Sequence, residues 1–205
     1  MEFQKLNETK AFLKSKGFEK ADWGVVLGTG LGAFVNELEI ITEVAYSVIP
    51  HFPIATVEFH KGKLIYATLN GHKLIVMQGR FHYYEGYSMQ QIVYPIRVMK
   101  LLGIEKLLIS NAAGAINLDY KKGELMVIDD HINLQPENPL RGPNIDELGD
   151  RFPDMSQPYS SRLNNILIES ANEMALKLHK GVYASVLGPN LETRAEYKFL
   201  KVIGS

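Results

Sequence analysis

Apolar residues recur along the chain at two spacings, which predict alternating helices and strands. Phe3, Leu6 and Leu13 fall at helical spacing, and Gly17 follows as a stop signal. Short uninterrupted apolar runs such as Val25-Val26-Leu27 are typical of strands. The pattern predicts helices over residues 3–16, 88–102, 163–178 and 192–202. It predicts strands over residues 25–27, 40–49, 63–70, 73–77, 106–110 and 182–187, and a strand pair within 124–133.

Local signals refine this pattern. Asn70-Gly71 between two apolar runs predicts a hairpin with a type I′ turn. Pro95 lies inside a predicted helix and should kink it. The uninterrupted Leu107-Leu108-Ile109 favours a parallel strand covered on both faces. Residues 135–157 are proline-rich without sustained periodicity, and a loop of that length is usually functional.

The fold class expected from this order is α/β, with a mixed, largely parallel central sheet flanked by helices. The 205 residues include 46% hydrophobic and 22% charged residues, as in an ordinary globular protein. No repeat or linker interrupts the chain, so we expect a single domain over residues 1–205.

Charge and hydropathy exclude several classes of partner. The net charge of −1 provides no broad positive field to attract nucleic acid or an anionic membrane. The longest run of apolar and small residues, Gly24 to Val35, is shorter than the ~20 residues that cross a bilayer. The charged amino terminus lacks the apolar core of a secretory signal, so we expect the protein to stay in the cytoplasm. There are no cysteines, hence no thiol nucleophile.

Two loops rich in glycine and small residues, 28–32 and 111–115, follow predicted strands. Ligands of open α/β sheets bind at the carboxyl ends of strands, so these loops could share one crevice. Their backbone N–H groups would suit an anion, and the Thr29 hydroxyl could add a donor. The spacing also fits the G-x-G-x-x-A pattern of dinucleotide folds. No acid is placed to bind a ribose diol, which disfavours that alternative.

The segment 79–86 carries the densest chemistry. The planar fork of Arg80 suits two oxygens of a phosphate or carboxylate. On an extended segment Arg80, His82 and Tyr84 would project to one side, where they could hold an oxyanion and a polyol. The alternative is a structural ion pair with an aromatic edge.

Metal binding is disfavoured, because the six histidines form no HExxH or closely spaced pair and Asp129-Asp130-His131 lacks supporting ligands nearby. His60, between Phe59 and Gly62, is a modest site candidate. Glu192 stands where a predicted strand turns into a helix. It could accept N–H bonds from a heterocycle, or serve equally as first-turn charge that favours the helix dipole.

Longer motifs resemble the trimeric purine nucleoside phosphorylases of the nucleoside phosphorylase superfamily. They run in order through nearly the whole chain: GTGLG, FHKG, GRFHYYEG, SNAAGAIN, DHINL, NPLRGPN, GDRFPDMS and GPNLETRAE. The resemblance implies phosphorolysis of purine (deoxy)ribonucleosides such as inosine and guanosine to free base and pentose 1-phosphate, a reaction of purine salvage.

The same resemblance implies a role for each site residue. His82 and Glu192 would be catalytic, with Glu192 accepting from the purine N1–H. Tyr84 would bond the ribose, and Phe152 would cover the sugar in a neighbouring subunit's site of a homotrimer. The phosphate-binding set would be Thr29, His60, Arg80, His82 and the backbone N–H of Ala112. No metal or organic cofactor is implied, since phosphate is a co-substrate.

The chain departs from the family pattern at three places. Thr29 replaces the usual Ser and keeps the hydroxyl, whereas Leu191 replaces a frequent Phe and should weaken stacking near the base. The sequence stops at Ile203-Gly204-Ser205, before the family's C-terminal segment with its further phosphate and base contacts. Two alternatives therefore stay open: a non-catalytic phosphate- or purine-binding fragment, and methylthioadenosine phosphorylase, which GRFHYYEG and DHINLQPENPLRGPN disfavour.

Overall fold

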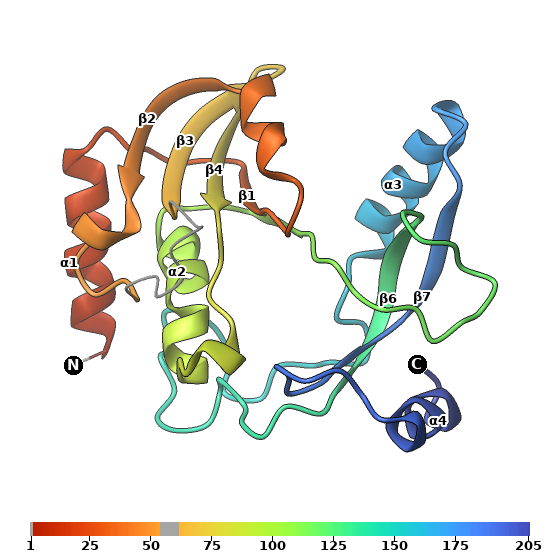
Figure 1. Cartoon of the computed structure of the whole chain (residues 1–205). Helices are drawn as coiled ribbons and strands as arrows, with labels where there is room; N and C mark the ends of the chain where they lie inside the picture. The colour runs from red at the N-terminus through yellow and green to blue at the C-terminus, as the bar shows by residue number, and fades with distance from the viewer. Residues whose placement is uncertain (1, 54–61) are drawn as a thin grey trace. The chain divides into compact units, whose positions relative to one another are not determined.

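The computed structural model describes residues 2–53 and 62–205, which group into two compact units (Figure 1). The first unit comprises residues 1–112 and 139–151, and the second comprises residues 113–138 and 152–205. That residues 1–205 are a single domain stays a prediction. The α/β class with a mixed sheet is confirmed.

A five-stranded sheet forms the centre of the first unit. Its strands, in spatial order, are β2 (Glu39–Ala45), β3 (Lys63–Leu69), β4 (His72–Gln78), β1 (Trp23–Val26) and β5 (Lys106–Ile109). β1 runs parallel to both β4 and β5, whereas β3 is antiparallel to β2 and β4. Asn70 and Gly71 both have positive φ, 49° and 79°, as the predicted type I′ hairpin requires.

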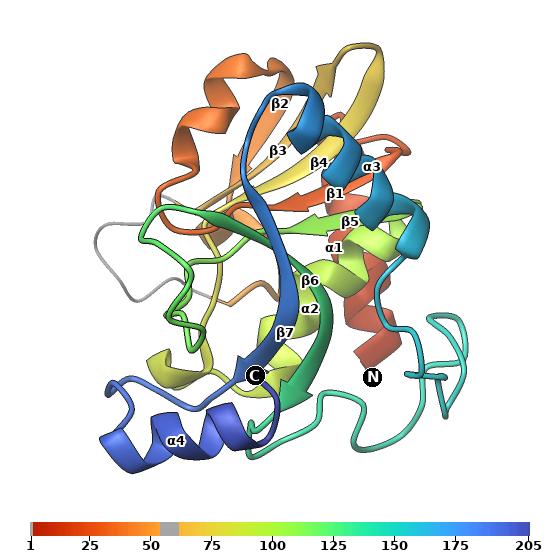
Figure 2. The same cartoon turned by 90° about the vertical axis from the view of Figure 1, so that its right-hand side faces the viewer.

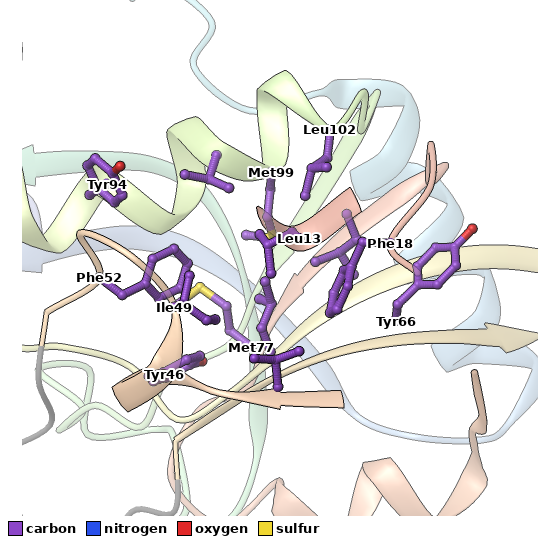
Figure 3. Close-up of a cluster of buried hydrophobic side chains, with 14 of the residues drawn as sticks. Leu13, Phe18, Tyr46, Ile49, Phe52, Tyr66, Met77, Tyr94, Met99 and Leu102 are labelled. Atoms are coloured by element: carbon purple, nitrogen blue, oxygen red, sulfur yellow. The ribbon is translucent and has the colours of Figure 1, made fainter. Parts of the chain in front are cut away.

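Helices α1 (Glu2–Ser15) and α2 (Met89–Leu101) pack on this sheet around one core (Figure 3). Leu13 of α1 and Met99 of α2 are fully buried against Phe18 and Tyr66. The buried Thr9 hydroxyl has two partners, the Tyr94 hydroxyl at 2.7 Å and the Pro50 carbonyl at 2.8 Å. Both predicted helices are confirmed, and α2 continues through Pro95.

Two predictions for the first unit were wrong. The strand expected over 40–49 ends at Ala45, because the chain then forms a 3-10 turn, η2 (Tyr46–Val48). β5 is not covered on both faces, since Leu108 and Ile109 are 41% and 52% exposed. In the described part of the chain β5 is the edge of its sheet and pairs only with β1.

The second unit contains the parallel pair β6 (Leu125–Asn133) and β7 (Leu178–Ser185), with α3 (Ser161–Glu173) against β6 and α4 (Arg194–Val202) after β7 (Figure 2). The strand pair expected within 124–133 is one strand. Leu178 begins β7 instead of ending the preceding helix, because Ala175 has a φ of 53° and turns the chain out of the helix. The predicted last helix is confirmed.

A polar cluster joins the amino ends of β6 and β7. Glu124 pairs with His179 at 2.7 Å and Lys177 at 3.0 Å, and the His179 ring stacks on Tyr120. The Lys121 backbone N–H, His179 and Lys177 together lower the pKa of Glu124 to about 2. This cluster lies at the opposite strand ends from those that bind ligands in α/β sheets, so we interpret it as structural.

The long segment without helix or strand predicted over 135–157 is confirmed. No helix within residues 2–53 and 62–205 has the length and apolar character needed to span a membrane.

Candidate active site

Three loops meet where β4, β1 and β5 end. These strands are parallel neighbours, with Val26 of β1 in register with Met77 of β4 and Ile109 of β5. The chain therefore leaves all three strands at the same end of the sheet, which is where ligands bind in such sheets. The loops that follow carry Thr29, Arg80 and Ala112, so the two loops predicted from the sequence begin side by side, at Gly28 and Asn111.

Ser110 joins these loops. Its backbone N–H donates to the Val26 carbonyl at 3.0 Å, and its hydroxyl donates to the same carbonyl at 3.2 Å. The Ser110 hydroxyl also accepts from the Gly28 N–H at 2.9 Å. Ser110 was not among the predicted site residues, although its position directly after an apolar strand was a usable signal.

Gly28 allows the two backbones to approach each other. A Cβ atom at this position would lie 2.7 Å from the Ser110 carbonyl oxygen and 2.9 Å from the Asn111 Cα, closer than real Cβ atoms come. Glycine is therefore required by the close packing of the 28–32 and 110–112 loops.

We expect Gly28→Ala to destabilise the fold by about 1–3 kcal/mol, the usual cost of overpacking, and to weaken binding of an anion at these loops because both loops must shift. Gly32→Ala is the matched control, since a Cβ there meets nothing within 4 Å and its φ is not in the left-handed region. Thermal unfolding and phosphate titration of both variants check this. Equal behaviour of the two variants would contradict the steric argument.

Arg80 is half-buried and donates from Nη2 to the Ser110 carbonyl. This bond holds the guanidinium beside the loop that contains Ala112. Thr29 and the Ala112 backbone, both exposed, follow Gly28 and Ser110 by one and two residues. The same strand ends thus bring together a guanidinium, a hydroxyl-bearing residue and loop N–H groups, the chemistry of an anion site.

His82 is held by Glu85. Its Nδ1 lies 2.5 Å from Glu85 Oε1, and its backbone N–H donates to the same oxygen at 2.9 Å. The Glu85 side chain is only 8% exposed. A buried carboxylate at Nδ1 favours the tautomer with hydrogen there, so Nε2 faces away from Glu85 as an acceptor, or as a donor when the ring is protonated.

The expected extended arrangement of 80–84 was wrong beyond His82. Tyr83–Glu85 is a 3-10 turn, η3, capped by His82 and Glu85. His82 and Tyr84 nevertheless lie together, because their rings stack with centroids 4.8 Å apart. His82 thus contacts a carboxylate, Glu85, and an aromatic ring, Tyr84, and the two contacts together orient its ring.

Leu191 and Glu192 lie in the second unit between β7 and α4. Thr193 is the N-cap of α4, and Glu196 is the acid of its first turn, with Glu196 Oε2 accepting from the Thr193 N–H at 2.6 Å. Glu192 thus precedes the helix, which disfavours the helix-dipole alternative. A hydrogen bond to the Glu192 carboxylate raises the pKa of Tyr197.

The remaining candidates divide as follows. Phe152 and Leu191 are exposed side chains of the second unit. His60 lies outside the described residues. His131 hydrogen-bonds through Nδ1 with the Tyr159 hydroxyl at 3.2 Å. Across the described ranges, no group of three or more His, Cys, Asp or Glu side chains is arranged to hold a metal ion.

Comparison with known proteins places this chain in a family. The model of the Phosphorylase superfamily matches residues 22–205. Purine nucleoside phosphorylase 1 of Geobacillus stearothermophilus is 47% identical over 97% of this chain and 73% of its own length. Purine nucleoside phosphorylase of Bos taurus is 40% identical over 99% of this chain and 72% of its own.

A solved structure agrees with these relatives. Isoform 2 of purine nucleoside phosphorylase from Schistosoma mansoni, in complex with cytosine and ribose-1-phosphate, superposes with a TM-score of 0.93 at 41% identity. The match covers 98% of this chain and 73% of the Schistosoma mansoni chain. The chain therefore belongs to the phosphorylase superfamily and, within it, to the purine nucleoside phosphorylases.

Proposed function

We propose that this protein catalyses phosphorolysis of purine (deoxy)ribonucleosides such as inosine and guanosine, releasing the free base and (deoxy)ribose 1-phosphate. The observation that carries the proposal is the junction of Gly28, Arg80 and Ser110 at three parallel strand ends. This junction holds the Arg80 guanidinium beside the loops that carry Thr29 and Ala112, which supports an anion site there. The ribose-1-phosphate in the Schistosoma mansoni neighbour, which is the product of such a reaction, supports the assignment.

The roles of the site residues follow from the charge that the reaction develops. As the glycosidic bond breaks, the sugar gains oxocarbenium character and the purine gains negative charge. Phosphate held by Arg80, Thr29, His82 and the Ala112 N–H would lie beside the cationic sugar as its nucleophile. Glu192 would accept from the purine N1–H, and Tyr84 would bond the ribose. Positioning of the reactants supplies much of the acceleration.

Phosphate is thus a co-substrate in this proposal, and no metal or organic cofactor takes part. We further propose a cytoplasmic homotrimer in which Phe152 covers the sugar in a neighbouring subunit's site. The exposure of Phe152 supports this role, because 87% of a large aromatic residue remains accessible.

The test is release of hypoxanthine from inosine with and without phosphate. We expect release only with phosphate, because in this proposal phosphate, held by Arg80, is the nucleophile that attacks the sugar. Equal rates would make the protein a hydrolase. No release in either condition, with purine and phosphate still bound, would favour the non-catalytic alternative. Adenosine should be a poor substrate, since it offers a bare acceptor to Glu192.

A further inference from the structure

Two side chains of α2 hold the backbone of the loop that leads to Phe152. Gln90 Nε2 donates to the Pro139 carbonyl at 2.9 Å and to the Arg141 carbonyl at 3.3 Å. Arg97 Nη2 donates to the same Pro139 carbonyl at 3.0 Å. Both residues and the loop belong to the first unit, so these contacts lie within one compact body.

The two side chains also fix each other. Gln90 and Arg97 are seven residues apart, two turns of helix, and therefore lie on one face. Arg97 Nη1 donates to Gln90 Oε1 at 3.0 Å and also pairs with Glu2 of α1. Because the Gln90 oxygen faces Arg97, its amide nitrogen must face the loop. The Arg97 side chain is only 16% exposed, so its own hydrogen bonds are largely shielded from water.

The rest of the loop is anchored as well. Ile145 and Leu148 pack against the core of the first unit. Arg151 Nη1 donates to the Leu140 carbonyl at 2.7 Å, which ties the end of the loop back to the part that Gln90 and Arg97 hold. Phe152 is the next residue, so the loop that leads to it is held at three places along its length.

We propose that Gln90 and Arg97 are positioning residues for Phe152, which they present through loop 139–151 to the sugar in a neighbouring subunit's site. This inference rests on the proposed function of Phe152. A loop of this length without helix or strand loses much conformational entropy when it is ordered. Anchoring it to α2 means that this entropy is already lost when the chain folds, and nucleoside binding need not order the loop.

The variant that tests the proposal is Gln90→Ala, and its matched control is Gln91→Ala. Gln91 is the next residue of the same helix, and its Oε1 accepts from the Ser88 N–H at the helix cap. We expect Gln90→Ala to raise the KM for inosine about three- to tenfold, as loss of one or two hydrogen bonds allows, with the KM for phosphate unchanged. Gln91→Ala should leave both constants unchanged. Gln90→Glu, which keeps the size and the partner of Arg97 but loses the donors, should resemble Gln90→Ala.

The Phe152→Ala variant and subunit mixing show whether the positioning role of Gln90 or the proposed role of Phe152 itself is wrong. Gln90→Ala subunits mixed with Arg80→Ala subunits should regain activity, because some sites then combine an intact Arg80 with an intact neighbouring loop. Gln90→Ala should add nothing to Phe152→Ala in the double variant.

If Phe152→Ala raises the KM for inosine and Gln90→Ala does not, the positioning role is overturned while the function of Phe152 stands. If Phe152→Ala itself changes nothing, both are overturned. A loss in Gln90→Ala that affects both substrates equally, without recovery on mixing, would also overturn the positioning role.

Discussion

Arg80→Ala is expected to raise the KM for phosphate roughly 10- to 150-fold, because a hydrogen bond to a charged group contributes about 1.5–3 kcal/mol. The effect should be confined to phosphate. A hydrogen bond to the Ser110 carbonyl holds Arg80 at the ends of β4, β1 and β5. The planar guanidinium would bind two phosphate oxygens there. The measurement is initial rate against phosphate concentration at saturating inosine, and against inosine at saturating phosphate.

Arg80→Lys is the informative partner of this variant. It keeps the charge but not the planar fork, so it should recover only part of the loss. Thermal unfolding of both variants shows whether the bond to Ser110 also supports the fold. An unchanged KM for phosphate in both variants would mean that Arg80 is structural.

Glu192→Ala is expected to lower kcat/KM for inosine by a similar factor, roughly 10- to 150-fold, and to weaken the preference for inosine over adenosine. In the proposed function, this carboxylate would accept from the N–H that inosine has at purine position 1 and adenosine lacks. A site built on such a bond rejects the analogue because a buried polar group is then left unpaired. Removing the carboxylate removes that penalty for adenosine.

Two matched variants isolate the effect of Glu192. Glu196→Ala deletes a carboxylate four residues away that caps α4, so it should change helix stability and not substrate preference. Tyr197→Phe removes only the hydroxyl bonded to Glu192, so it should have a smaller effect than Glu192→Ala. If Glu192→Ala keeps the full inosine preference, Glu192 does not recognise the base.

Sequence periodicity determined most elements of this protein. Asn70-Gly71 imposes positive φ on a two-residue turn, and the apolar spacing of α1 and α2 identifies the faces that the core buries. These signals are local, because propensity and spacing act within a few residues. Errors arose where a local cap or turn competed, as at η2 after Ala45 and at Ala175 before β7.

Residue chemistry and motif resemblance named Thr29, Arg80, His82, Ala112 and Glu192, but neither indicated what holds them. Only the tertiary structure showed Ser110 joining two loops, Glu85 orienting His82, and Gln90 with Arg97 holding the loop before Phe152. Except for Glu85, these partners lie far from their targets in the chain. For Ser110, strand order and direction decide the contact: β1 lies between β4 and β5 and runs parallel to both, so three distant segments leave the sheet at the same strand ends. Side-chain spacing along a single strand carries no record of which strand becomes its neighbour, so this part of the site was decided by packing.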